Sequence, residues 1–232
     1  MGRIEELNAR NDFRVHSIAE EGFRTYGRVW KGITVDGLIR TSESSTPIPD
    51  AGNVYVPSSL DFESIPETDV IRSAVFGGLP VQAGYCNGRN ATFNGFEYHK
   101  VPEVNIAVTD FCLALGHSWE IKDDLTYDVS NAEVFFVPRG TVLELFGTTL
   151  HLSPLRTEES GFKAIVILPR GTNTPLTEAE KQASEKAFAE GNAEARLLLQ
   201  KHKWVIAHPE REVLIRQGAH AGVTGVNKGL NI

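Results

Sequence analysis

The chain has 232 residues, a formal net charge of −7 and a hydrophobic content of 41%. This length suits one domain, and the composition is that of a folded protein rather than a disordered one. The 23 Lys and Arg residues form no dense run, so a nucleic-acid surface, which needs clustered positive charge, is not expected. No segment reaches the roughly 18 consecutive apolar residues that a membrane span requires.

The first residues are charged and lack the apolar core of a signal peptide, so we expect a cytoplasmic protein. Cys86 and Cys112 are too few for a disulfide framework. They are expected to be small buried thiols.

The N-terminal third, residues 1–69, is predicted to be an arm that covers the rest of the domain. Residues 17–26 carry a short helical pattern. Residues 41–59 are rich in Ser and Pro and predict a long irregular connection that wraps the surface or covers a site.

From Val70 the hydrophobic period changes to two, which is typical of strands. Asn87-Gly88 predicts a hairpin turn between two of them. Eight short strands within residues 70–170 predict an antiparallel sandwich or barrel, and closure into a barrel would remove exposed edges. The predicted strands are VIRSAVF, LPVQAGYC, ATFNGFEYHK, VNIAVTDFCLAL, AEVFFVP, GTVLELFG, TTLHLSPL and GFKAIVIL.

Residues 171–232 are predicted to be mainly helical. Thr177 and Glu180 form a capping box at the start of one helix. A second, short helix is expected between Pro209 and Gly218, because Pro favours the first turn of a helix and Gly its end. Both helices are expected to pack on the outside of the barrel, within one domain of residues 1–232.

The segment Phe96–Glu103 contains the first candidate ligands. Residues two apart on a strand share a face, so Glu97 and His99 point together. Glu103 follows Pro102, which bends or ends the strand and can return a third ligand to the same place.

A second polar group follows the predicted turn Pro138–Gly140. Glu144 shares a face with Val142, and in the next strand His151 shares a face with Thr149 and Ser153. Two histidines with two or three carboxylates suit Mn, Fe, Co, Ni or Zn. Each residue taken alone is more commonly a solvent-facing strand residue, but the combination favours a divalent metal site.

These residues resemble the two motifs of the cupin superfamily. The first motif is His-x-His, three or four residues, then Glu. Glu97 stands in the place of its first His, whereas His99 and Glu103 match. The second motif is Pro-x-Gly followed by a His, and Pro138 and Gly140 match it.

The resemblance leaves the fourth ligand open. The second motif expects its His near Leu143 and Glu144, whereas His151 comes later in the chain. Either Glu144 or His151 is therefore the fourth ligand. His151 is preferred because imidazole is the commoner ligand of transition metals.

A closer resemblance covers most of the chain. The runs GFEYHKVPEVNIAVTD, FFVPRGTVLELFGTTLHLSP, GFKAIVILPRGTNTP and KWVIAHPE resemble a bacterial family, long catalogued as of unknown function, that includes sulfoquinovose isomerases. The resemblance implies a mainly β cupin fold (a double-stranded β-helix or jelly-roll barrel) with N- and C-terminal extensions. It also implies a divalent metal and conversion of 6-deoxy-6-sulfoglucose to 6-deoxy-6-sulfofructose. Because cupins often pair, a homodimer is expected.

Such an isomerase moves a hydrogen between C1 and C2 of an open-chain sugar. Glu144 is the first candidate for the proton carrier if it is not a ligand, and Glu97 is the reserve. The alternative role for Glu144 is to orient a metal-bound histidine.

An anionic tail on the sugar would need Arg or Lys. Lys100, Arg89 and Lys163 are candidates, although strand alternation points Lys100 away from His99. The further candidates for the pocket are His208, Tyr85 and Asn87, and for each candidate a purely structural role is the commoner one.

Two other functions compete with the isomerase. The N-terminal run FRVHSIAEEGFRTYGRVW resembles ureidoglycolate lyases, which are also cupins. A non-catalytic sugar-binding cupin is the third hypothesis. A carboxylate base beside the metal, the role predicted for Glu144, would distinguish both enzymes from a binding module.

Overall fold

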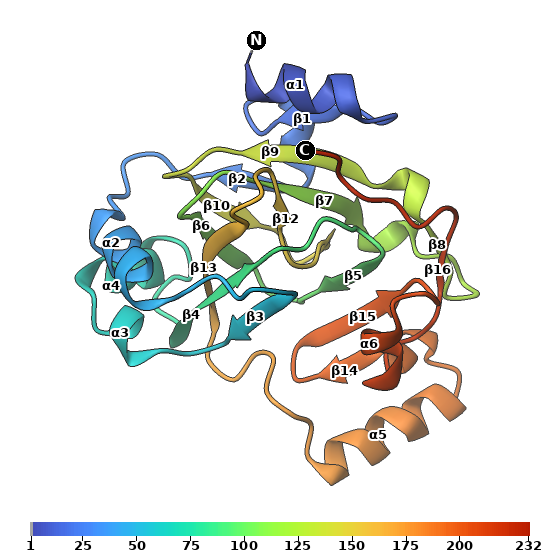
Figure 1. Ribbon diagram of the computed structural model, residues 1–232. Helices are drawn as coiled ribbons and strands as arrows, with labels where there is room; N and C mark the ends of the chain where they lie inside the picture. Colours follow the sequence, from blue (N-terminus) through green and yellow to red (C-terminus); the bar gives the residue numbers. More distant parts are fainter. Residues whose placement is uncertain (1) are drawn as a thin grey trace.

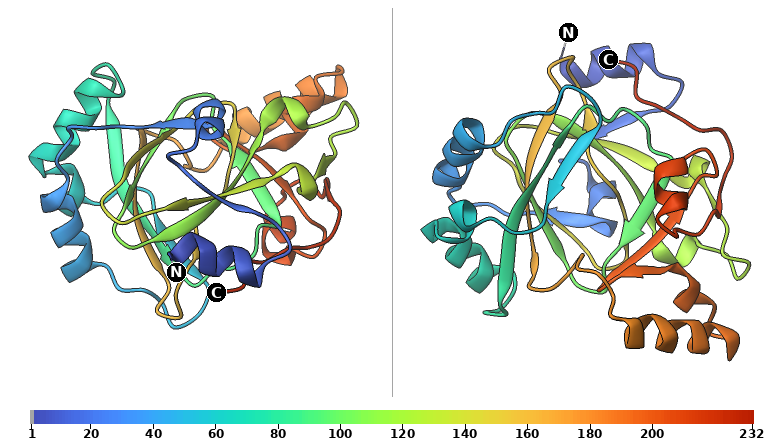
Figure 2. Two further views of the ribbon diagram at one scale, coloured as in Figure 1. Left: turned by 90° about the horizontal axis from the view of Figure 1, so that it is seen from above. Right: turned by 60° about the horizontal axis from the view of Figure 1, so that its bottom comes forward.

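The computed structural model describes residues 2–232, and its centre is a barrel of two facing antiparallel sheets (Figures 1 and 2). One sheet has the order β10-β6-β13-β4. In the other sheet, β9 pairs with β7, and β7 pairs in turn with β11 and with β12. An isolated bridge between Glu97 and His151 joins β5 to the segment after β11 and so adds β5 at the far edge. The bounds are β4 Val81–Gly88, β5 Gly95–Tyr98, β6 Glu103–Ala107, β7 Phe111–His117, β9 Glu133–Val137, β10 Val142–Leu145, β11 Thr149–Leu150, β12 Leu155–Arg156 and β13 Phe162–Pro169.

This strand order is that of a jelly roll. Along the chain, the barrel strands cross from one sheet to the other and end in β13, which lies between β4 and β6. Such crossing connections build the two Greek keys of an eight-stranded jelly roll. The mainly β jelly-roll fold predicted from the sequence is therefore confirmed.

Additional strands from both ends of the chain extend the two sheets and cover their edges. The N-terminal arm contributes β1 Val15–Ser17 beside β9, β2 Gly27–Val29 beside β10, and β3 Asn53–Val56 beside β4. The C-terminal hairpin of β14 Leu198–Gln200 and β15 Lys203–Ala207 lies beside β5. A small separate pair joins β8 Tyr127–Asp128 to β16 Val223–Thr224.

The helices lie outside the barrel (Figure 1). They are α1 Arg3–Arg10, α2 Asp36–Ser45, α3 Leu60–Glu63, α4 Pro66–Ala74, α5 Glu178–Ala189 and α6 Glu212–Arg216, with 3-10 turns η1 Glu21–Thr25, η2 Ser118–Glu120, η3 Val129–Asn131 and η4 Ala193–Leu197. The predicted capping box of Thr177 and Glu180 is present at α5. Within residues 2–232, no helix has both the length and the apolar character needed to cross a bilayer.

The three largest apolar clusters of the described residues form layers, and these layers define which way each barrel-strand residue points. Leu113, Phe135 and Phe162 fill the space between the two sheets. Leu38, Phe62, Ile71 and Ile106 pack between the first sheet and α2, α3 and α4, and Phe96, Tyr127 and Leu150 pack behind the second sheet. Successive residues of a strand therefore alternate between the barrel interior and an outer layer.

Three local predictions are corrected. The predicted strand VIRSAVF belongs mostly to α4, which begins at Pro66 and buries Ile71 against the first sheet. The predicted helix over 17–26 is split between β1 and η1, and residues 41–59 include the end of α2 and all of β3. A short apolar run fits either a helix or a strand, and the packing partner decides between them.

Of the two turns predicted from the sequence, one is absent and one is present. Gly88 ends the long strand β4, where it pairs with Phe162, so Asn87-Gly88 is not a hairpin turn. The predicted turn at Pro138–Gly140 is confirmed, with Gly140 at φ +83°. Both cysteines are free and buried, as expected.

Candidate metal centre

The structure brings the four predicted ligands together inside the barrel. Glu97 comes from β5, His99 follows β5, Glu103 begins β6, and His151 follows β11. One ligand atom from each residue lies within 4.8 Å of the others, and all four side chains are buried. The Glu97–His151 bridge places two of these segments side by side, and the short connection from β5 into β6 brings Glu103 back to them.

Both imidazoles are held in the orientation that a metal site needs. Nδ1 of His99 donates to the main-chain carbonyl of His202 at 2.6 Å, and Nδ1 of His151 donates to the carbonyl of Thr149 at 2.9 Å. A carbonyl only accepts, so each Nδ1 carries the hydrogen. In the neutral imidazole, Nε2 then presents a lone pair, which is the usual arrangement at metal-binding histidines.

The two Nε2 atoms converge on Glu103. Oε2 of Glu103 lies 3.2 Å from Nε2 of His99 and 3.4 Å from Nε2 of His151. Within residues 2–232, neither Nε2 has a hydrogen-bond partner of suitable geometry. Lone pairs aimed at a buried carboxylate repel it unless a proton or a cation lies between them. The donor set therefore fits a divalent cation.

The charges of this group are coupled. Burial alone would raise the pKa of Glu103, but the neighbouring His151 and His99 hold that pKa below its usual range. Burial would lower the pKa of His151, but Glu103 outweighs it and raises that pKa. The site thus favours a positive charge beside Glu103. A bound metal ion would carry such a charge.

Two supporting contacts hold the carboxylates. Oε1 of Glu103 accepts a hydrogen bond from Nδ2 of Asn105 at 2.9 Å. Glu97 forms an ion pair through Oε2 with Nζ of Lys203, and its Oε1 lies 3.8 Å from Nε2 of His99. The carboxylate of Glu97 therefore lies farther from the histidines than the carboxylate of Glu103 does.

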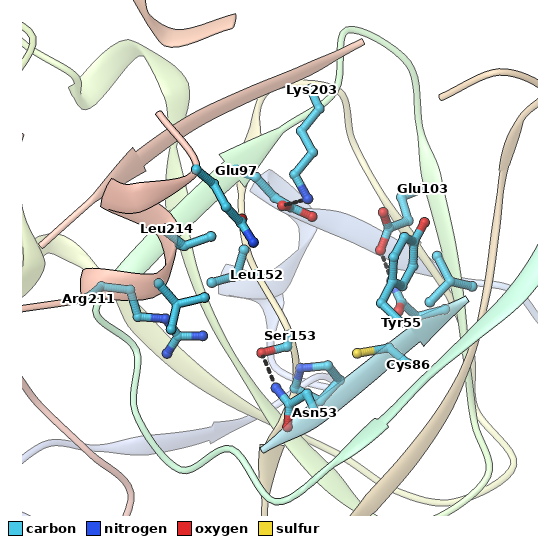
Figure 3. Close-up of a pocket in the computed structure, with 15 residues that line it drawn as sticks. Asn53, Tyr55, Cys86, Glu97, Glu103, Leu152, Ser153, Lys203, Arg211 and Leu214 are labelled. Carbon is cyan, nitrogen blue, oxygen red and sulfur yellow. Dashed lines mark hydrogen bonds and ion pairs between the residues drawn. The ribbon is translucent and has the colours of Figure 1, made fainter. Parts of the chain in front are cut away.

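A cavity of about 280 Å³ opens onto this centre (Figure 3). This volume lies near the lower end of the usual range for small-molecule sites, about 300–1,000 Å³. Its wall includes Glu97 and Glu103 from the metal centre, and polar or charged side chains from other parts of the chain: Asn53, Tyr55, Asn105, Ser153, Lys203, Arg211 and Gln217. The cavity is accordingly small, and its wall is mixed, since it also includes Leu152, Val166 and Leu214.

Glu144 lies elsewhere, which corrects the role predicted for it at the metal. Its neighbours Leu143 and Leu145 point into the barrel, so Glu144 points to the outer face of β10. There its Oε2 accepts a hydrogen bond from Nε1 of Trp30 at 2.8 Å and lies 3.6 Å from Nε of Arg28. Glu144 is neither a fourth ligand nor a proton carrier in this cavity.

Three of the predicted substrate-binding residues also point outward, on β4 and β13. Lys163 donates to the carbonyl of Ser42 at 2.8 Å, and Asn87, which pairs with Lys163 in the sheet, donates to Oγ1 of Thr46 at 3.0 Å. Tyr85 packs with the outer layer beneath the helices. Cys86 lies between Tyr85 and Asn87 on β4 and therefore points the opposite way, where it lines the cavity.

The other three predicted residues lie outside the cavity wall. Lys100 bonds to Oε2 of Glu194 at 2.7 Å and lies 4.6 Å from the ring centroid of Trp204, as strand alternation suggested. Arg89 lines a separate outer groove. His208 lies 3.3 Å from the carbonyl of Gly225.

Several wall residues that the sequence did not indicate come from the N-terminal arm and the C-terminal segment. Asn53 and Tyr55 belong to β3, within a segment predicted to be irregular. The two residues lie on either side of Val54 and so share one face of the strand, and this alternation was the sequence signal that could have indicated a strand here. Lys203 belongs to β15. Arg211 and Gln217 flank α6, so the expected last helix does approach the barrel mouth, but with these residues rather than His208.

Comparison with solved structures gives only distant likenesses. Vicilin from hazelnut, Corylus avellana, is 12% identical with a TM-score of 0.30, over 56% of this chain and 39% of vicilin. A cupin-2 domain protein from Shewanella frigidimarina is 16% identical with a TM-score of 0.26, over 39% of this chain and 71% of that protein. A single-residue mutant of Bacillus subtilis oxalate decarboxylase is 11% identical with a TM-score of 0.31, over 59% and 36% respectively.

The chain spans well under half the length of hazelnut vicilin and of oxalate decarboxylase, and TM-scores this low carry nothing about activity. The curated proteins include no match to this chain. A family sequence profile, however, matches residues 15–228, which include all four clustered residues of the metal centre. The chain therefore belongs to the family described as Domain of unknown function (DUF4867).

Proposed function

We propose that the protein is a divalent-metal-dependent aldose–ketose isomerase acting on a small sugar, with sulfoquinovose as the first substrate to test. The observation that carries this proposal is the pair of oriented imidazoles facing Glu103 beside a cavity lined in part by polar and charged side chains. A divalent ion held by these groups, Mn, Co, Ni, Fe or Zn, would act as a Lewis acid toward two neighbouring substrate oxygens.

Glu97 is the residue that we propose moves the proton. It lines the cavity, whereas Glu144 does not, and it is the carboxylate that lies farther from the histidines. Its carboxylate would accept the proton from C2 of the open-chain aldose as that C–H bond breaks. It would return the proton to C1 while the proton of the O2 hydroxyl passes to O1, which gives the ketose without an added reactant.

Lys203 supports this role of Glu97. Its ammonium group is paired with Oε2 of Glu97, and both side chains are largely buried. The positive charge stabilises the ionised carboxylate, which is the form that accepts a proton. His99, Glu103 and His151 then form the closest group of metal ligands.

The first experiment uses purified full-length protein that has been stripped of metal and reloaded separately with each of the five metals. Conversion of aldose to ketose is followed by NMR in deuterated water, first with sulfoquinovose and then with glucose 6-phosphate, lyxose and mannose. We expect metal-dependent turnover, with deuterium entering at C2 of the recovered aldose. Glu97→Gln should lower kcat at least about 100-fold, within the usual contribution of a general base.

Glu144→Gln is the matched control, because this carboxylate lies on the outer face of the barrel and should not alter turnover. If no sugar is converted although the metal binds at His99 and Glu103, the isomerase proposal is wrong. The same samples are then tested for release of urea and glyoxylate from ureidoglycolate, and for sugar binding without turnover.

A further inference from the structure

We infer that the cavity has a second recognition subsite, in which Arg211 binds an anionic group of the substrate, a sulfonate or phosphate, while the metal centre binds the other end. This inference rests on the proposed function for the identity of the sugar, but the presence of an anion subsite can be tested without turnover. Arg211 belongs to neither the predicted site nor the metal centre.

The first observation is the placement of Arg211. It lines the same cavity as Glu97 and Glu103, and it immediately precedes α6. Figure 3 shows its guanidinium on the opposite side of the cavity from Glu103. A molecule that fills this cavity would therefore contact carboxylates at one end and a guanidinium at the other.

The second observation is that Arg211 has neutral partners. Its Nη1 donates to Oδ1 of Asn94 at 3.0 Å and to Oγ1 of Thr92 at 3.3 Å. Among residues 2–232, no carboxylate lies within ion-pair distance of this guanidinium, whereas Lys203, the other cation of the cavity, is paired with Glu97. The positive charge of Arg211 is thus oriented but not neutralised.

The third observation concerns solvation. Arg211 is half-buried, and burial lowers the pKa of its guanidinium without a contribution from any neighbouring charge. A guanidinium that is partly removed from water and lacks a counter-ion gains from a bound anion. Its remaining N–H groups match the fork geometry of sulfonate and phosphate oxygens.

Two other arginines, Arg89 and Arg216, lie in a neighbouring outer groove, and neither fits the anion subsite as Arg211 does. Arg211 lines both that groove and the cavity, whereas Arg89 and Arg216 line only the groove. Arg216 is already paired with Glu212, and Arg89 donates from Nε to the carbonyl of Pro49 at 3.0 Å. Arg216 is exposed and close in sequence, so it provides a matched control.

Calorimetric titration of inorganic sulfate into the full-length protein tests the subsite directly. Wild type and His99→Ala should bind sulfate alike, because the subsite does not require the metal. Arg211→Met should weaken binding at least about 10-fold, since a charge-assisted hydrogen bond to an anion is lost. Arg216→Met should bind as wild type does.

Arg211→Lys provides a second variant if Arg211→Met fails to fold. Lysine retains the charge but loses the planar fork, so sulfate binding should weaken by about fivefold. Unchanged sulfate binding in the folded Arg211 variants would overturn the inference, as would loss of binding only in His99→Ala.

If the isomerase is active, the ratio of KM for glucose 6-phosphate to KM for glucose should rise at least about 10-fold in Arg211→Met. Sulfate binding that depends on Arg211 without any sugar turnover would retain the subsite and reject only the isomerase. Turnover without an effect of Arg211 on either measurement would retain the isomerase and reject the subsite.

Discussion

The main-chain carbonyl of His202 accepts a hydrogen bond from Nδ1 of His99 at 2.6 Å, although the two residues are 103 positions apart. His202 lies at the turn between β14 and β15 with φ +55°, in the left-handed region. The next residue, Lys203, is the one that pairs with Glu97. This hairpin therefore orients one candidate ligand and neutralises another.

Replacement of His202 tests this orienting role. His202→Gly adopts a positive φ without strain and retains the carbonyl, so metal affinity should stay within about threefold of wild type. His202→Val strains the same turn, and displacement of the carbonyl should lower metal affinity by about 10- to 100-fold, as losses of such supporting contacts do. Metal affinity is measured by competition with a coloured chelator, and equal affinities in the two variants would argue against the role.

The four clustered residues should bind one divalent ion per chain. His151→Ala and Glu103→Gln should each weaken that binding by more than about 100-fold, because each removes a ligand rather than a supporting contact. Mass spectrometry of the native protein gives the stoichiometry, and equilibrium dialysis gives the affinity. Retention of wild-type affinity in both variants would show that the ion binds elsewhere.

Lys203→Met should separate catalysis from metal binding. The variant keeps His99, Glu103 and His151, the closest group of ligands, but removes the charge beside Glu97. We expect kcat to fall by about 10-fold, since the ionised carboxylate loses a stabilising partner. Metal content and circular dichroism should stay as in wild type, and an unchanged kcat would contradict the assignment.

Glu144→Ala should affect stability and not chemistry. Its buried carboxylate accepts the hydrogen bond of the Trp30 indole, so removal leaves that donor without a partner. A buried hydrogen bond to a charged group contributes about 1.5–3 kcal/mol, and the free energy of unfolding should fall by about that amount. Urea unfolding measures this change. A large loss of kcat in folded protein would return Glu144 to the mechanism.

Cys86 should be unreactive in the metal-free protein even though it lines the cavity. Burial raises the pKa of its thiol to about 12, and the nearby carboxylates Glu103 and Glu97 act in the same direction. A raised pKa favours the neutral thiol, so at pH 8 the reactive thiolate is on the order of 1,000-fold scarcer than for an ordinary cysteine. Iodoacetamide labelling from pH 7 to 10, read by peptide mass spectrometry, should show little modification in the folded protein and rapid modification in urea.

The sequence by itself predicted the jelly-roll barrel and the four residues that cluster inside it. Alternation along a strand is a local property, so Glu97 and His99 could be placed on one face without knowledge of the rest of the fold. Glu103 was added because Pro102 can bend the chain back toward His99, and His151 was preferred because imidazole is the commoner ligand of transition metals. The capping box at Thr177 is equally local, because its partners are only three residues apart.

Only the tertiary structure decided which face of each strand points into the barrel. Alternation shows that Lys163 and Ile165 share a face, but helices α2, α3 and α4 cover that face, so both residues lie outside the cavity. The same reason excludes Glu144. Lys203 and Arg211 reach the cavity from segments about 100 residues away from Glu97, and no local pattern encodes such contacts. Only the folded chain brings these two cations to one cavity, because their positions depend on how the C-terminal hairpin and the segment after it pack beside β5.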